Sequence, residues 1–236
     1  MTTSRSLRNA VAFTILGILG MVWGVMMGLV GWPMIWFGLA MLTVGANYAL
    51  PQHLAIFRKV HGKLGFGRKL FLLPYMVLLY GTWHLLRITS SEAPFVELTR
   101  GIFIGRRLLP GEYPPVATLV DLTAELDEHV PTSANLLAFP ILDGAPADPS
   151  LLHEMARKIG MSPRPVYLHC AQGHGRTSMV AAAMLLELSL AQSVEDALEM
   201  IKMVRPGAKP NVLQRQALMA AFPGGVMQAV NDPPTP

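Results

Sequence analysis

The sequence predicts an α/β domain preceded by an α-helical membrane region. The first 90 residues carry eight of the 19 basic residues and no Asp or Glu, and they include about 41 consecutive residues without charge. From residue 91 onward, short apolar runs alternate with amphipathic segments and turn residues, which is typical of α/β domains. We therefore predict a membrane region over 1–90 and a folded domain over 91–222.

The composition indicates that part of the chain lies in a lipid bilayer, and it argues against nucleic acid as a partner. Hydrophobic residues make up 52% of the chain and charged residues 14%, with a mean hydropathy of +0.40, on the apolar side of soluble domains. The pI of about 9.4 comes from basic residues that flank apolar runs. Nucleic-acid sites instead gather basic and aromatic residues on one face.

The uncharged stretch is long enough for two membrane spans. Its 41 residues would form a helix of about 60 Å, twice the thickness of a hydrocarbon core. Gly31-Trp32-Pro33 lies near its middle, where Pro and Gly break helices and Trp suits the interface. We predict a hairpin of helices at 10–30 and 33–50. A cleaved signal peptide is the competing interpretation, but the apolar stretch is too long and lacks a cleavage site.

Glycines recur at helical spacing on the first predicted span. Gly20, Gly24 and Gly28 are each four residues apart, and small residues at this spacing let two membrane helices approach closely. The hairpin therefore has a candidate packing seam.

Two further segments complete the membrane region. Residues 51–69 are rich in Lys and Arg and are expected to form a loop or interfacial helix that faces anionic headgroups. The apolar run 70–86 is at the short limit for a span, so it is either a third span or an interfacial helix. A third span would place the folded domain on the opposite side of the membrane. We expect a multi-pass membrane protein with the folded domain in the cytoplasm.

The folded domain is predicted to contain alternating strands and helices. Strands are expected at 102–105, 116–122, 136–142 and 166–169, and helices at 151–159, 177–190 and from Ser193 onward. Arg106 and Arg107, after the first strand, are expected to face water, with a place in the lining of the phosphate pocket as the alternative. Residues 223–236 are rich in Pro and Gly and are expected to be disordered.

One loop carries the chemistry. An apolar strand ends at His169-Cys170, and the loop Ala171-Gln172-Gly173-His174-Gly175 leads to Arg176 and Thr177 at the start of an apolar helix. In this geometry the loop N–H groups and the helix N-terminus face one anion. The two glycines permit tight backbone curvature, and Arg176 offers a bidentate fork to phosphate.

Cys170 is the predicted nucleophile. It is the only cysteine, so an intrachain disulfide and a thiolate zinc site are excluded. A helix N-terminus and a cation favour its thiolate, which can attack phosphorus and form a phosphocysteine. Thr177 is expected to hydrogen-bond the departing sulfur, and His169 to brace the loop. A lone Cys with no such neighbours would be read as a small buried hydrophobe.

These residues resemble the protein tyrosine and dual-specificity phosphatase superfamily. Its signature His-Cys-x5-Arg-Ser/Thr is matched by His169, Cys170, Arg176 and Thr177. The resemblance covers about residues 95–220. It implies a central mixed sheet flanked by helices and a cysteine-dependent phosphoric monoester hydrolase that needs neither metal nor cofactor.

The resemblance also implies a general acid on a separate loop. Phe139-Pro140-Ile141-Leu142-Asp143-Gly144 is similar to the segment that carries it in the family, which makes Asp143 the candidate. Asp148 is the alternative, although an Asp before Pro149 is more simply explained as the cap of the following helix.

The substrate stays open between two classes. The substrate-binding positions are expected to be Ala171, Gln172, Gly173, His174, Gly175 and Arg176, and His174 adds positive charge when protonated. The substrate is a phosphorylated lipid headgroup or a phosphoprotein, reached from the membrane. The alternative function is a catalytically inactive phosphate-binding membrane adaptor.

Overall fold

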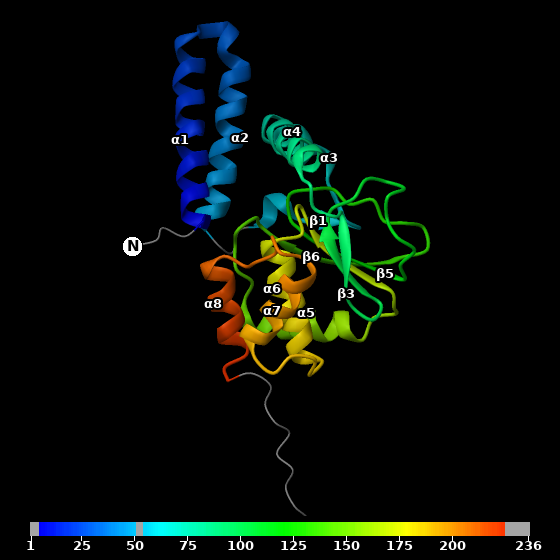
Figure 1. Cartoon of the computed structure of the whole chain (residues 1–236). Coiled ribbons are helices and arrows are strands. Elements are labelled where there is room, and N and C mark those ends of the chain that lie inside the picture. Colours follow the sequence, from blue (N-terminus) through cyan, green and yellow to red (C-terminus); the bar gives the residue numbers. More distant parts are fainter. Residues whose placement is uncertain (1–4, 51–53, 225–236) are drawn as a thin grey trace, which may run out of the picture.

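The computed structural model describes residues 5–50 and 54–224, and Figure 1 shows the order of the elements. A two-helix hairpin projects from a domain in which helices pack against a sheet. Residues 225–236, where most of the disordered tail is predicted, lie outside the described residues.

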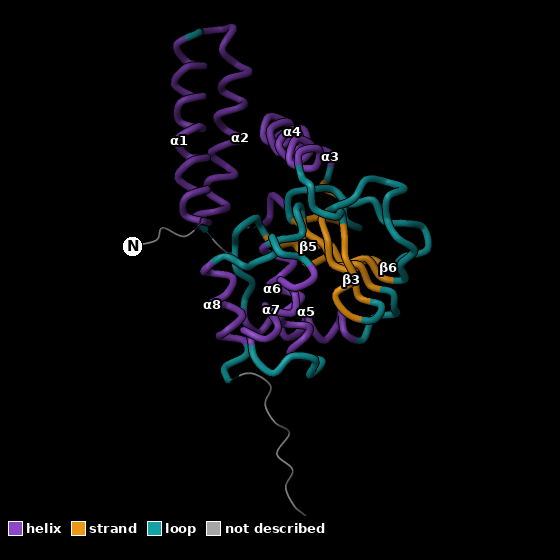
Figure 2. Tube along the Cα trace, viewed as in Figure 1, coloured by secondary structure: helices purple, strands orange, loops and turns teal. Residues whose placement is uncertain are grey.

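The domain is built on a five-stranded mixed sheet (Figure 2). Its order is β3-β4-β7-β5-β6. β3 is antiparallel to β4, and the other neighbours are parallel. This arrangement confirms the predicted α/β class with a mixed sheet. The strands are β3 Phe95–Thr99, β4 Ile102–Arg106, β5 Thr118–Thr123, β6 Asn135–Ile141 and β7 Val166–Cys170.

Four helices form the helical layer of the domain. Their bounds are α5 Pro149–Gly160, α6 Gly175–Glu187, α7 Val194–Val204 and α8 Val212–Ala221. Residues Arg176 to Leu186 of α6 are all buried, and the helix shares one core cluster with β4, β5 and β7. α7 begins after its N-cap Ser193, as predicted. β7, which is buried along its whole length, thus leads directly into the buried helix α6.

The hairpin consists of α1 Arg5–Met26, a short 3-10 helix Gly28–Gly31 and α2 Trp32–Ala49. The chain reverses slightly earlier than predicted, because Gly28 adopts φ +60° and Pro33 fits the first turn of α2. The segments Leu7–Met26 and Gly28–Ala49 are long and apolar enough to cross a membrane, by length and composition.

The glycine seam contains Gly20 and Gly24 as predicted, together with Gly17, but not Gly28. A Cβ on Gly24 would lie 2.8 Å from the backbone nitrogen of Ile35, and one on Gly38 would lie 2.8 Å from the carbonyl oxygen of Gly17. The two backbones therefore meet at glycines. A Cβ on Gly28 would meet nothing within 4 Å among the described residues, so Gly28 serves the reversal and not the seam.

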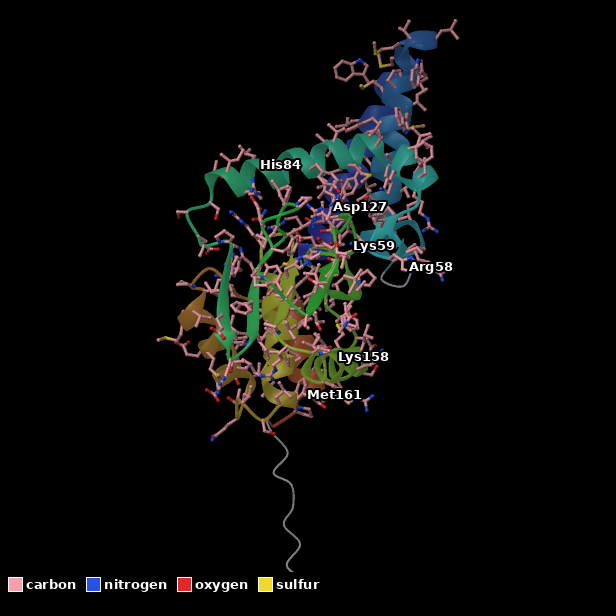
Figure 3. The ribbon with its side chains drawn as sticks, turned by 90° about the vertical axis from the view of Figure 1, so that its right-hand side faces the viewer. Arg58, Lys59, His84, Asp127, Lys158 and Met161 are labelled. Carbon is pink, nitrogen blue, oxygen red and sulfur yellow. The ribbon has the colours of Figure 1, made fainter. Side chains whose placement is uncertain are left out.

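The next segments fold against the domain. They are a 3-10 helix Leu54–Phe57, the two-residue strands β1 Lys59–Val60 and β2 Lys63–Leu64, α3 Phe66–Phe71 and α4 Leu73–Thr89. Figure 3, where His84 marks α4, shows this helix running across the domain and not alongside the hairpin. Leu72 and Tyr75 share a core cluster with Ala124 and Leu142 of the domain. At 17 residues, α4 is about 26 Å long, shorter than a hydrocarbon core.

Lys59 does not face lipid headgroups as expected of the basic segment 51–69. Its Nζ lies 2.7 Å from an Asp121 carboxylate oxygen, with both side chains buried, and it donates to Thr123. Burial disfavours the charged Asp121, but Lys59 outweighs burial and lowers the pKa of Asp121. Lys69 likewise pairs with Asp127. These basic side chains fasten the segment to the sheet.

Candidate active site

The loop between β7 and α6 has the predicted form. Gly173 adopts φ +72°, and a Cβ there would lie 2.3 Å from the backbone of Gly105 on β4. The glycine is therefore required by backbone conformation and by packing against the neighbouring strand. A Cβ on Gly175 would instead meet the side chain of Gln214. The loop is held tightly at the edge where the parallel strands end.

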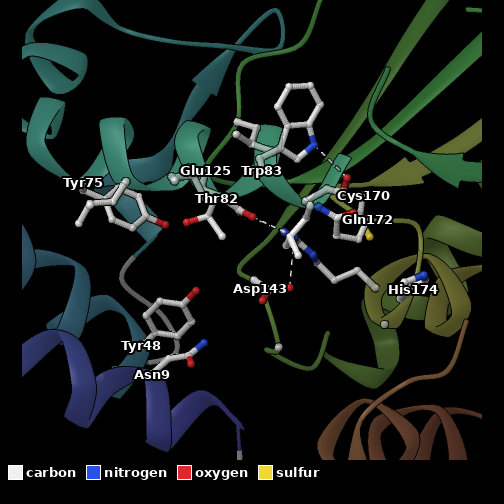
Figure 4. A pocket seen from close by; sticks show the side chains of 18 of the residues that line it. Asn9, Tyr48, Tyr75, Thr82, Trp83, Glu125, Asp143, Cys170, Gln172 and His174 are labelled. Atoms are coloured by element: carbon white, nitrogen blue, oxygen red, sulfur yellow. Dashed lines mark hydrogen bonds and ion pairs between the residues drawn. The ribbon is translucent and has the colours of Figure 1, made fainter. Parts of the chain in front are cut away.

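Cys170, Arg176 and Asp143 line one cavity of about 390 Å³ (Figure 4). Cys170 ends β7 and is 3% exposed, whereas Asp143 follows β6 and is 44% exposed. Asp143 Oδ1 lies 3.4 Å from Arg176 Nη2. The three residues predicted to act together are therefore brought together from separate elements.

Glu125 holds the guanidinium of Arg176. Its Oε1 lies 2.8 Å from Nη2 and its Oε2 accepts from Nη1 at 3.0 Å, while the Ile141 carbonyl also accepts from Nη1 at 2.7 Å. The buried Nε of Arg176 has no hydrogen-bond partner among the described residues. Burial disfavours the cation, but Glu125 and Asp143 outweigh it and raise the pKa of Arg176 well above its ordinary value. Arg176 is a fixed cation with one donor left to offer.

Arg205 supports the loop from behind. Its side chain donates to the carbonyls of Gly173 and Gln172, both at 3.1 Å, and lies 3.2 Å from Glu92. Carbonyls held from behind leave the loop N–H groups free to turn toward the cavity. Glu92 also lies 2.7 Å from His174 Nε2. His174 is therefore paired with a carboxylate, and its charge does not simply add to the phosphate site.

His169 is buried beside the loop and not in the cavity. Its ring stacks on Tyr167 with centroids 5.4 Å apart, and its Nε2 lies 3.5 Å from Glu128. Asp121, Glu128 and His169 have possible metal-ligand atoms within 4.8 Å of one another. Those carboxylates already face cations, since Lys59 pairs with Asp121 and Arg107 with Glu128. Both ring nitrogens of His169 are buried without a hydrogen-bond partner among the described residues, so the bracing role of His169 stays a prediction.

α4 contributes a wall of the cavity and touches the loop directly. Trp83 Nε1 donates to the carbonyl of Ala171 at 3.1 Å (Figure 4). The guanidinium carbon of Arg107 lies 4.9 Å from the centroid of the Trp83 ring, a cation–π distance. α4 and the loop between β7 and α6 therefore line one cavity.

Two expectations about charged residues are corrected. Arg107 does not face water: it is 3% exposed and donates to the carbonyl of Asp127 at 2.9 Å. Arg106 is partly buried and donates to the carbonyl of Arg87 on α4. Both were assigned to solvent because a short strand does not reveal that a distant helix covers its end.

The alternative acid Asp148 lies outside the cavity. It is the N-cap of α5 and accepts from the backbone N–H of Ser150 at 2.9 Å. Its hydrogen bonds from Ser150 lower the pKa of Asp148.

Thr177 is buried, and its Oγ1 has no hydrogen-bond partner among the described residues. Its predicted bond to sulfur stays a prediction.

Neither a family model nor a curated protein matches the sequence, but solved structures do. Human DUSP28 is 20% identical over 56% of this chain and 95% of its own, with a TM-score of 0.47. PTPMT1, solved in complex with PI(5)P, is 16% identical over 55% and 94%, with a TM-score of 0.48. OH1, a tyrosine phosphatase from the Orf virus, is 18% identical over 59% and 96%, with a TM-score of 0.45.

The chain is similar to dual-specificity and tyrosine phosphatases. Three supporting residues lie outside the signature and were not predicted. Glu125 is 51 residues from Arg176, Arg205 is 32 residues from Gly173, and Trp83 is 88 residues from Ala171. The acidic run Glu125-Leu126-Asp127-Glu128, directly after a buried strand, was the one available signal for Glu125.

Proposed function

We propose that this chain is a membrane-bound phosphatase that hydrolyses phosphomonoesters through a phosphocysteine intermediate. The observation that carries the proposal is the buried Arg176 beside Cys170. Glu125 occupies both of its Nη atoms, and its Nε has no hydrogen-bond partner in the part of the chain that is described. A buried cation with an unused donor, at a helix N-terminus, suits a phosphate oxygen.

The reaction proceeds in two displacements. The Cys170 thiolate attacks phosphorus, so that a P–S bond forms while the P–O bond to the leaving group breaks. Asp143 gives its proton to the leaving oxygen. Water then attacks phosphorus, Asp143 takes up the proton of that water, and the P–S bond breaks to release inorganic phosphate and the thiolate. The Thr177 hydroxyl donates a hydrogen bond to the departing sulfur.

The loop and Arg176 stabilise the charge on the phosphoryl oxygens throughout. The backbone N–H groups of residues 171–175 and the Nε of Arg176 are the donors in this proposal. Arg205 and Glu125 act as positioning residues, because they hold the loop carbonyls and the guanidinium in place. Preorganised donors of this kind are usually the largest contribution to catalysis.

The hairpin α1–α2 spans the bilayer in this proposal, with both ends and the catalytic domain on the cytoplasmic side. α4 lies at the membrane surface as an interfacial helix and not as a third span. Its length, its course across the domain and its contact with Ala171 support this assignment. The active site then faces the headgroup layer.

Rapid quenching tests the proposal. Full-length protein in detergent is mixed with p-nitrophenyl phosphate, quenched, digested and analysed by mass spectrometry for a phosphoryl group on the peptide that contains Cys170. We expect the phosphopeptide in the wild type and no phosphate release by Cys170→Ser, with a loss of about 10⁴-fold or more. Turnover that survives Cys170→Ser would exclude Cys170 as nucleophile. Phosphate binding without turnover by the wild type would favour the inactive adaptor.

A further inference from the structure

The walls of the active-site cavity differ sharply from its floor. The floor is the loop with Cys170 and Arg176, and the walls come from α1, α2 and α4. Six wall residues of α4 recur at helical spacing, so one face of the helix is turned to the cavity. They are Tyr75, Leu78, Leu79, Thr82, Trp83 and Leu86.

The wall carries both polar groups and exposed apolar side chains. Figure 4 shows the Tyr48 and Tyr75 hydroxyls and the Asn9 amide on the side of Asp143 and Glu125. Leu78 and Leu86 line the same cavity and remain 48% and 46% exposed. The cavity therefore combines a buried cation, polar groups and apolar surface that still contacts solvent.

We propose that this cavity takes a lipid phosphomonoester, with the phosphate on the loop and the acyl part along Leu78, Leu79 and Leu86. The proposal rests on the proposed phosphatase function and names its substrate class. An acyl chain is favoured here because it removes the exposed leucine surface from water.

A phosphoprotein fits this apolar surface less well. A peptide that lay on Leu78 and Leu86 would bring backbone N–H and C=O groups against apolar side chains, and unpaired peptide groups are costly to bury. A lipid also needs no transfer out of the bilayer to arrive, since α1 and α2 carry the apolar segments long enough to span it. Charge at the floor and exposed apolar surface in the wall match an amphiphile with an anionic end.

The experiment compares two esters that differ only in their acyl chains. Full-length protein in mixed micelles is given phosphatidylglycerophosphate or its deacylated headgroup, with Cys170→Ser as the blank and a phosphotyrosine peptide as a third substrate. We expect kcat/KM to be at least about tenfold higher for the acylated ester than for the headgroup, since an apolar tail adds favourable burial.

Two neighbouring leucines provide a matched pair of variants. Leu86→Ser alters the wall, whereas Leu85→Ser removes an equally large apolar side chain, 62% exposed, that does not line the cavity. We expect the ratio of kcat/KM for lipid to headgroup to fall about fivefold or more in Leu86→Ser and to stay unchanged in Leu85→Ser. Leu78→Ser, also in the wall, should repeat the result of Leu86→Ser.

Each contrary outcome has a distinct meaning. An equal fall in the lipid-to-headgroup ratio of kcat/KM in Leu85→Ser and Leu86→Ser would assign the effect to membrane attachment. It would contradict the proposal that the acyl chain binds along the cavity wall. Cys170-dependent release with no preference for acyl chains, or a preference for the peptide, would overturn the lipid inference and leave the phosphatase intact. Absence of Cys170-dependent release from every substrate would overturn the proposed function itself.

Discussion

The two sides of the active-site cavity have opposite origins. The loop side is a continuous segment, β7 to α6, in which strand, loop and helix follow one another within the chain. The membrane side is assembled from α1, α2 and α4, which lie 80 or more residues before the loop, as the Trp83 to Ala171 contact illustrates. The signature residues therefore lie in one local segment, whereas the shape of the cavity around them depends on long-range packing.

Arg176→Lys is the strongest test of the loop side. Lysine keeps a charge but lacks the planar fork that Glu125 holds, so we expect kcat to fall about 10³-fold, the upper range for loss of a preorganised donor. Steady-state kinetics with p-nitrophenyl phosphate measure the loss. A loss below about tenfold would mean that charge alone suffices and that the Glu125 clamp is not required.

Asp121→Asn tests the buried ion pair that joins Lys59 on β1 to Asp121 on β5. The variant leaves the buried Lys59 without its carboxylate, which costs about 3 kcal/mol of stability. The pKa of Asp121 is lowered in the folded protein from 3.8, so its contribution is present above about pH 4 and is lost as pH falls through the folded pKa.

Thermal unfolding from pH 7 down to pH 3 measures the contribution of this ion pair to stability. We expect a lower Tm for Asp121→Asn at pH 7 and a difference from the wild type that shrinks at the acid end. A Tm difference that is constant across this range would argue against an ionic pair of Lys59 and Asp121.

Asp143→Asn tests whether Asp143 is the general acid of the proposed reaction. Loss of a general acid typically costs 10²–10⁴-fold, and we expect about 10² for an alkyl phosphate, whose leaving oxygen needs a proton. An aryl phosphate with an acidic leaving group should lose much less. The comparison of the two esters in one variant provides its own control, and equal losses would remove Asp143 from the role of acid.

Trp83→Phe is the smallest expected effect and belongs to the membrane side. Phenylalanine keeps an aromatic ring beside Arg107 but removes the donor to the Ala171 carbonyl. One neutral hydrogen bond contributes about 1 kcal/mol, so we expect about a fivefold loss of kcat/KM. An unchanged value would show that α4 shapes the cavity without holding the loop.

The sequence was sufficient for the elements whose signals are local. Strand β7, the glycine loop and α6 were predicted because an apolar strand, two glycines and an apolar helix follow directly on one another. β3 was missed, since it is a short edge strand whose partner β4 follows across a two-residue turn. α8 was missed although Asn211 and Gln214 form a capping box.

For the candidate site as well, the residues with local sequence signals were predicted and the others were not. Cys170, Arg176 and Asp143 meet in one cavity because two of them share the loop and the third ends a parallel strand in the same sheet. Glu125 was not foreseen, although the acidic run after β5 was a local signal for it. Arg205 and Trp83 were not foreseen because no local pattern distinguishes a charged or aromatic residue that crosses the fold to support a loop. Buried Lys59 shows the same difficulty, since its neighbours suggested a membrane surface.

The hydrogen bond from Trp83 to Ala171 has a practical consequence for dividing this chain. A chain cut at residue 90, where the charge composition changes, would lose Lys59, α4 and the ring that covers Arg107. It would also lose Leu72 and Tyr75 and thereby expose Ala124 and Leu142, which share their core cluster. Truncation at that point would therefore remove structural support from the loop between β7 and α6, so a fragment that keeps this loop intact has to retain the segment from the 3-10 helix at Leu54 onward.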